Sequence, residues 1–111
     1  MAGEPDSLEV DLDTFAAAYA AGAVVLDVRN PDEYESGHVR GAVLIPLGEL
    51  GERQDDIPDG DPVYVICAMG GRSLQATKAM VQAGYVALSV SGGTKGWIER
   101  GHPVVAGNSP E

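Results

Sequence analysis

The sequence predicts an α/β domain in which helices cover both faces of a mainly parallel central sheet of about five strands. Short runs that are nearly continuous in apolar residues recur along the chain, as is typical of strands buried on both faces of a parallel sheet. Helical patterns lie between these runs, and this alternation indicates strand–helix–strand crossovers. The 111 residues form one domain, with a core over about 8–105 and flexible tails at 1–7 and 106–111.

Four apolar runs are predicted to form the main strands, and a fifth segment forms an edge strand. The runs are short and rich in Val, Leu and Ile, and Gly or Pro lies close to each of them. They cover residues 24–28, 42–45, 63–66 and 86–90, and the edge strand covers residues 8–10.

Four helices are predicted from capping residues and apolar spacing. Asp13 caps the first, in which Phe15 and Tyr19 share a face, and Gly22 ends it. The second helix begins with Pro in its first turn, and a glycine directly follows the second, the third and the fourth helix. These three helices cover residues 31–36, 73–83 and 94–100.

The charge is distributed unevenly along the chain. The net charge is −10, and residues 1–61 carry 15 acidic and three basic side chains, whereas residues 62–111 carry two acidic and four basic ones. Nucleic acid is a poor partner for such a chain, because phosphate contacts depend on Lys and Arg. We expect an anionic substrate to bind the second half, residues 62–111, and we interpret the acidic first half as a solubilising surface.

The composition also excludes several kinds of site. With one cysteine and two histidines, the sequence predicts no internal disulfide and no metal site. Neither a membrane-spanning apolar run nor a secretory signal is recognised, so the expected compartment is the cytoplasm. No cofactor, nucleic-acid partner or membrane partner is expected.

The only cysteine, Cys67, ends a predicted strand and is followed by Gly70, Gly71 and the start of a helix. Ligands of open α/β sheets bind beyond the carboxyl ends of the strands, and such a turn can point several amide N–H groups into one concavity. Lowering the pKa of a thiol from about 8.5 to about 6.5 requires about 2.7 kcal/mol, more than a helix N-terminus supplies. Loop amides and Arg72 must therefore contribute. The alternative is a buried cysteine acting as a small hydrophobic residue.

Three segments, in the expected order, resemble the rhodanese family over about residues 8–105. Residues 25–46 resemble the first signature of rhodanese domains, and residues 67–73 resemble their active loop. The segment from Leu88 through Gly92-Gly93 and Trp97 to residues 101–104 resembles their closing segment. The resemblance implies a rhodanese-like fold and the activity of a sulfurtransferase of the thiosulfate sulfurtransferase type.

In that family the cysteine, here Cys67, attacks the sulfane sulfur of a small anionic donor such as thiosulfate. The persulfide then passes its outer sulfur to cyanide or a thiol, and another protein can be donor or acceptor. The resemblance makes Cys67 the catalytic residue. The rest of the loop is assigned to substrate binding: Ala68, Met69, Gly70, Gly71, Arg72 and Ser73.

Two other functions are weighed against sulfur transfer. A non-catalytic rhodanese-like module that docks a partner often lacks the cysteine, which is present here. Cysteine-type phosphatases and arsenate reductases have five residues between cysteine and arginine, whereas four separate Cys67 from Arg72, and Ile66 stands where those enzymes usually have His.

Several roles near the loop stay open. Arg72 binds the donor's oxyanion or, alternatively, forms a structural ion pair with an acid of the first half. Met69 stands where some thiosulfate-specific members carry a cation, which favours a protein persulfide or an organic thiol as substrate.

The remaining polar and aromatic residues of the matched segments receive mostly structural roles. Asp27 and Arg29 are expected to pair with each other or with Glu33, and Lys95 to add positive potential near the loop. His38 is expected to hydrogen-bond a neighbouring strand, His102 to lie on the surface, and Trp97 to pack the last helix onto the sheet.

Overall fold

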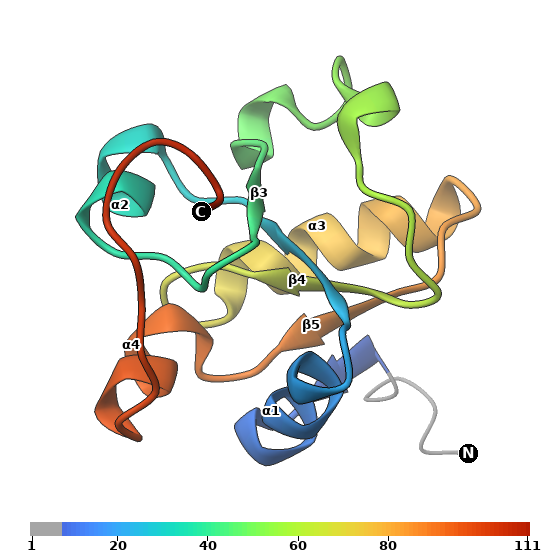
Figure 1. Ribbon diagram of the computed structural model, residues 1–111. Helices are drawn as coiled ribbons and strands as arrows, with labels where there is room; N and C mark the ends of the chain where they lie inside the picture. Colours follow the sequence, from blue (N-terminus) through green and yellow to red (C-terminus); the bar gives the residue numbers. More distant parts are fainter. Residues whose placement is uncertain (1–7) are drawn as a thin grey trace.

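The computed structural model describes residues 8–111 and contains a five-stranded sheet in the order β1-β5-β4-β2-β3, with every neighbouring pair parallel (Figure 1). The predicted tail at 1–7 lies outside the described residues. The strands are β1 (Glu9–Val10), β2 (Val24–Asp27), β3 (Val43–Leu44), β4 (Val63–Ile66) and β5 (Ala87–Val90). The helices are α1 (Leu12–Ala20), α2 (Pro31–Ser36), α3 (Gly71–Gln82) and α4 (Gly93–Glu99), with 3₁₀ turns η2 (Leu47–Glu49) and η3 (Gln54–Asp56).

Both faces of the sheet are apolar because successive side chains of a strand point to opposite faces and the strands are nearly continuous in apolar residues. In β4, Val63 and Val65 join the apolar cluster that includes residues of α3, whereas Tyr64 and Ile66 join the cluster formed with α1, α2 and α4. Figure 1 shows α3 on one side of the sheet and α1 on the other. The predicted α/β architecture with helices on both faces is therefore confirmed.

Helix α1 begins earlier than predicted. Its N-cap is Asp11, whose Oδ1 accepts a hydrogen bond from the backbone N–H of Thr14 at 2.8 Å, and Asp13 lies in the first turn. Two aspartates two residues apart both satisfy the preference for an acid at a helix start. The sequence pattern could not show which of them has the extended backbone of a cap.

Segment 106–111 is tied to the protein, although a flexible tail is predicted there. The N–H of Gly41 donates to the carbonyl of Pro110, and the N–H of Gly107 donates to the carbonyl of Glu35, each at 2.9 Å. His38 forms an antiparallel bridge with Val105, and its ring nitrogens lie 2.9 Å from the carbonyl of Tyr34 and 3.3 Å from that of Pro110. Figure 1 shows this red segment running beside α2.

Trp97 packs α4 against the sheet, as predicted. Its side chain is buried, its ring centroid lies 5.2 Å from that of Phe15, and it shares an apolar cluster with residues of β4 and β5. His102 is half-buried rather than on the surface, because its ring stacks on Trp97 at 4.0 Å. No helix in the described part of the chain is both long enough and apolar enough to cross a membrane.

Candidate active site

Cys67 lies directly after β4, where the chain turns into α3. Its Sγ accepts the backbone N–H of Gly70 at 3.0 Å and lies 3.4 Å from the Ser73 hydroxyl. The side chain is 1% exposed and also touches the apolar cluster on the α3 face. The cysteine is thus buried, as the hydrophobic alternative expects, but its sulfur is a hydrogen-bond acceptor within the loop.

The loop around Cys67 is closed from the other side by the start of α4. The N–H of Thr94 donates to the carbonyl of Cys67 at 2.8 Å, and the N–H of Lys95 donates to the carbonyl of Ala68 at 3.0 Å. A Cβ on Gly93 would lie 2.5 Å from the Ala68 carbonyl oxygen, so only glycine allows this close approach. The carboxyl ends of β4 and β5 therefore build one site, as neighbouring parallel strands do.

Opposing influences act on the pKa of Cys67. Burial is the largest and raises the pKa of the thiol, because it removes the thiolate from water. Hydrogen bonds from the Ser73 side chain and from the amides of Ser73, Gly70 and Met69 lower it, and together they outweigh burial. The net pKa lies below the ordinary value for a cysteine. Loop amides thus supply stabilisation that a helix dipole alone does not.

Arg72 is held in an ion pair with Glu33. Its two guanidinium nitrogens Nη1 and Nη2 donate to the two carboxylate oxygens at 2.8 and 2.9 Å. The hydrogen bond from Arg72 is the main cause that lowers the pKa of Glu33 to about 2. Of the two roles predicted for Arg72, the structure therefore contains the structural ion pair with an acid of the first half. The hydrogen bond to Glu33 is also the main cause that raises the pKa of Arg72; burial opposes this rise, and the charge of Cys67 adds a smaller increase.

Asp27 and Arg29 form a buried pair at the end of β2. Arg29 Nη2 donates to Asp27 Oδ2 at 2.8 Å and to the carbonyl of Gly37 at 2.9 Å, and the backbone N–H of Arg29 donates to Asp27 Oδ1 at 3.0 Å. Both side chains are almost fully buried. The pair joins the end of β2 to the end of α2, which is a structural role beside the site.

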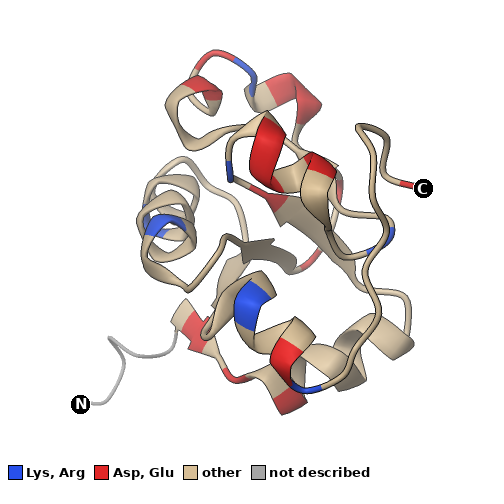
Figure 2. Cartoon of the chain, turned by 90° about the vertical axis from the view of Figure 1, so that its left-hand side faces the viewer, with Lys and Arg blue, Asp and Glu red and all other residues tan. Residues whose placement is uncertain are grey.

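Met69 belongs to the loop and Lys95 lies close to it, and the two residues expose different groups. The Met69 side chain is 68% exposed and forms an apolar part of the surface beside Cys67. Lys95 bonds the loop through its backbone N–H, and its residue is exposed. The helix α2 and the 3₁₀ turns η2 and η3 carry acidic residues in their first turns, and Figure 2, which colours the chain by residue type, shows more Asp and Glu positions than Lys and Arg positions.

Ser89 is a residue of the site that the sequence pattern does not indicate. Its hydroxyl lies on β5, is fully buried, and is 2.8 Å from the hydroxyl of Ser73. The one available signal is that Ser89 is a hydroxyl residue inside an otherwise apolar run. The sequence names Glu33 as a partner for Asp27 or Arg29 and gives Arg72 an unspecified acid of the first half; in the structure, Glu33 is that acid.

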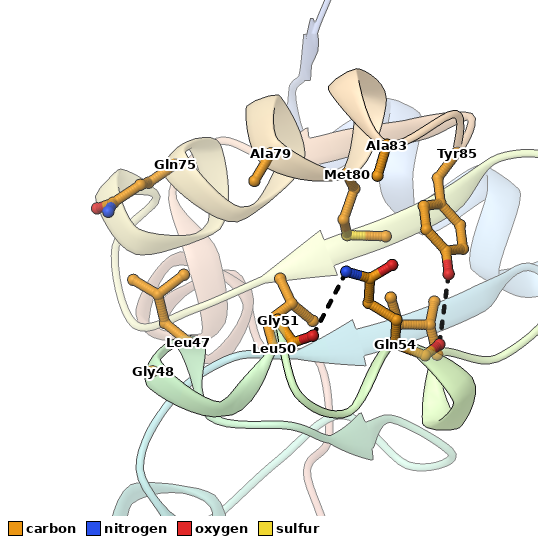
Figure 3. A pocket seen from close by; sticks show the side chains of 11 residues that line it. Leu47, Gly48, Leu50, Gly51, Gln54, Gln75, Ala79, Met80, Ala83 and Tyr85 are labelled. Carbon is orange, nitrogen blue, oxygen red and sulfur yellow. Dashed lines mark hydrogen bonds between the residues drawn. The ribbon is translucent and has the colours of Figure 1, made fainter.

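A pocket of about 440 Å³ lies apart from this loop, between α3 and the segment that contains η2 and η3 (Figure 3). Leu47, Leu50, Ile57 and Met80 contribute apolar walls. Its polar contacts, drawn in Figure 3, join the Gln54 side chain to the Gly51 carbonyl and the Tyr85 hydroxyl to the Gln54 carbonyl. Its lining contains none of the loop residues 67–73, so the sulfur of Cys67 lies outside it.

A profile of the Rhodanese-like domain family matches residues 11–100. The putative sulfur carrier protein YrkF of Bacillus subtilis is 39% identical over 74 residues, which make up 66% of this chain but only 40% of that protein. A sulfurtransferase of Allochromatium vinosum is 31% identical over 101 residues, 88% of this chain and 94% of the relative. The solved structure of a rhodanese-related protein from Thermoplasma volcanium superposes with a TM-score of 0.82 at 34% identity, covering 89% of this chain and 98% of that one.

Proposed function

Because the chain belongs to the family of rhodanese-like domains, we propose that it is a sulfurtransferase that carries sulfur as a persulfide on Cys67. The observation that carries the proposal is the hydrogen bond from the Gly70 N–H to Cys67 Sγ at 3.0 Å, within a loop whose amides lower the pKa of the thiol. The thiolate is the nucleophilic form of cysteine. The same donors suit the persulfide, which is also an anion.

The reaction has two displacements, and the electrons balance without a redox partner. In the first, the Cys67 thiolate attacks the outer sulfur of the donor, a new S–S bond forms, and the donor's own bond to that sulfur breaks. With thiosulfate, sulfite leaves with the electron pair. In the second, an acceptor thiolate or cyanide attacks the outer sulfur and Cys67 leaves as a thiolate.

The surface beside the loop favours a thiol-bearing substrate over free thiosulfate. Met69 exposes an apolar side chain there, and the guanidinium of Arg72 is already bonded to Glu33. An oxyanion such as thiosulfate binds best to an unengaged cation. We therefore propose that the sulfur partners are organic thiols or protein persulfides in the cytoplasm, and that thiosulfate is a usable but weakly bound donor.

The phosphatase and arsenate reductase alternative finds less support. Four residues separate Cys67 from Arg72, and the guanidinium lies against Glu33. A non-catalytic module that only docks a partner does not need the hydrogen bonds that the buried sulfur of Cys67 forms.

A thiosulfate and cyanide assay on the full chain tests the proposal. We expect thiocyanate and sulfite to form, and Cys67→Ser to abolish both while circular dichroism stays unchanged. Intact-mass measurement after thiosulfate should show one added sulfur, about 32 Da. Absence of both turnover and the added sulfur, or hydrolysis of an aryl phosphate, would overturn the proposal.

A further inference from the structure

Two buried serines extend the hydrogen bonding of Cys67 into the sheet. The Ser73 hydroxyl lies 3.4 Å from Cys67 Sγ, 3.1 Å from the carbonyl oxygen of Gly70 and 2.8 Å from the hydroxyl of Ser89. Both serines are fully buried. Ser89 lies on β5 opposite Val65 of β4, two residues before Cys67 along the chain, so the sheet fixes its position relative to the loop.

Counting hydrogens assigns a direction to this chain of groups. A hydroxyl donates one hydrogen bond, and a buried hydroxyl is almost always paired. Among residues 8–111, Ser73 is the only side-chain hydrogen-bond partner of Ser89, so the hydrogen of the Ser89 side chain has a side-chain acceptor only if Ser89 donates to Ser73. This leaves the hydrogen of Ser73 for either the Gly70 carbonyl or the sulfur of Cys67.

The protonation state of Cys67 decides between those two acceptors. A neutral thiol can donate its own hydrogen to Ser73, whose hydroxyl then donates to the carbonyl of Gly70. A thiolate only accepts, so the Ser73 hydrogen turns to the sulfur. The Gly70 carbonyl stays bonded after this turn, because it also accepts the backbone N–H of Leu74 at 3.1 Å.

We propose that Ser89 is a positioning residue whose buried hydroxyl donates to Ser73 and thereby directs the Ser73 hydroxyl toward the sulfur of Cys67. A hydroxyl that accepts a hydrogen bond is itself a stronger donor, because the two bonds polarise each other. Ser89 thus stabilises the thiolate without touching it. The inference rests on the proposed function only in giving that thiolate a role in sulfur transfer.

The test is a pH titration of the thiolate's ultraviolet absorbance in the full chain, with Cys67→Ser as the blank. The single cysteine makes the difference signal specific. We expect Ser73→Ala to raise the apparent pKa of Cys67 by about one unit and Ser89→Ala to raise it by about half a unit. The matched control is Ser91→Ala, which replaces an exposed serine in the turn directly after β5 and should leave the pKa unchanged.

The double variant distinguishes positioning from a general loosening of the site. If Ser89 acts through Ser73, then Ser89→Ala has no further effect in the Ser73→Ala background. An unchanged pKa in Ser89→Ala, or an equal shift with and without the Ser73 hydroxyl, would overturn the inference. The titration needs no sulfur donor, so its outcome is independent of whether the chain proves to transfer sulfur.

Discussion

Replacing Gly93 by alanine tests how the start of α4 supports the loop. Gly93 has a φ of +60°, and an added Cβ would lie 2.5 Å from the carbonyl oxygen of Ala68 and 2.6 Å from that of Cys67. Both neighbours are backbone atoms, so the overlap is relieved only by separating α4 from the loop. That movement breaks the hydrogen bonds from the N–H groups of Thr94 and Lys95 to these carbonyls.

The expected cost of Gly93→Ala follows from these contacts. The left-handed backbone costs alanine about 1–2 kcal/mol, and each lost hydrogen bond costs about 0.5–1.5 kcal/mol. We expect the free energy of unfolding, measured by urea denaturation, to fall by about 2–5 kcal/mol. The thiolate titration should also show the pKa of Cys67 moving toward its ordinary value, because the displaced loop no longer directs its amides at the sulfur.

Gly101→Ala is the matched control for backbone strain. Gly101 has a φ of +86°, but an added Cβ there meets nothing within 4 Å. This variant should lose only about 1–2 kcal/mol and leave the pKa of Cys67 unchanged. Equal losses in the two variants, with the Cys67 pKa unaffected in both, would refute the close packing of α4 on the loop.

Three further predictions concern the ion pairs and the exposed part of the loop. The pKa of Glu33 is lowered to about 2, so its pair with Arg72 stabilises the fold above about pH 4.5, and this contribution is lost as the pH falls toward 2. Because both side chains are about one-third exposed, we expect Glu33→Gln to lower the free energy of unfolding, measured by urea denaturation, by about 1 kcal/mol near neutral pH and by almost nothing at pH 2. An equal loss at both pH values would contradict this prediction. Arg29→Met leaves the buried carboxylate of Asp27 unpaired and should cost about 3–5 kcal/mol, part of which Asp27→Asn in the same chain restores; a loss below about 1 kcal/mol in denaturation would argue against the pair. Met69→Lys places a cation beside the loop and should lower the KM for thiosulfate with little change in kcat or stability, whereas an unchanged KM would show that this surface does not meet the donor.

The fold and the position of Cys67 between a strand and a helix were predictable because their signals are local. The apolar run 63–66, followed by Cys67, two glycines and a helical pattern, indicates a strand, a loop and a helix without reference to the rest of the chain. The same holds for the second helix, which covers Pro31–Ser36 as predicted. Parallel pairing then brings the strand ends to one edge of the sheet.

The contacts between distant segments could not be predicted in the same way. Arg72 had several acids available in the first half, and only the fold shows that Glu33 is its partner. Ser89 resembles any strand residue until β5 lies beside β4 and brings its hydroxyl to Ser73. The segment 106–111 looks like a polar tail, yet its backbone forms hydrogen bonds with the carbonyl of Glu35 in α2 and with the N–H of Gly41.

The central claim is that loop amides and the Ser73 hydroxyl hold the sulfur of Cys67 as an anion. The most direct measurement is the pKa of Cys67 in the unaltered chain, from the thiolate absorbance corrected with the Cys67→Ser chain. The account predicts a value below the ordinary reference value of a free cysteine. A value at or above that reference would show that burial dominates over the hydrogen bonds, and would contradict the account.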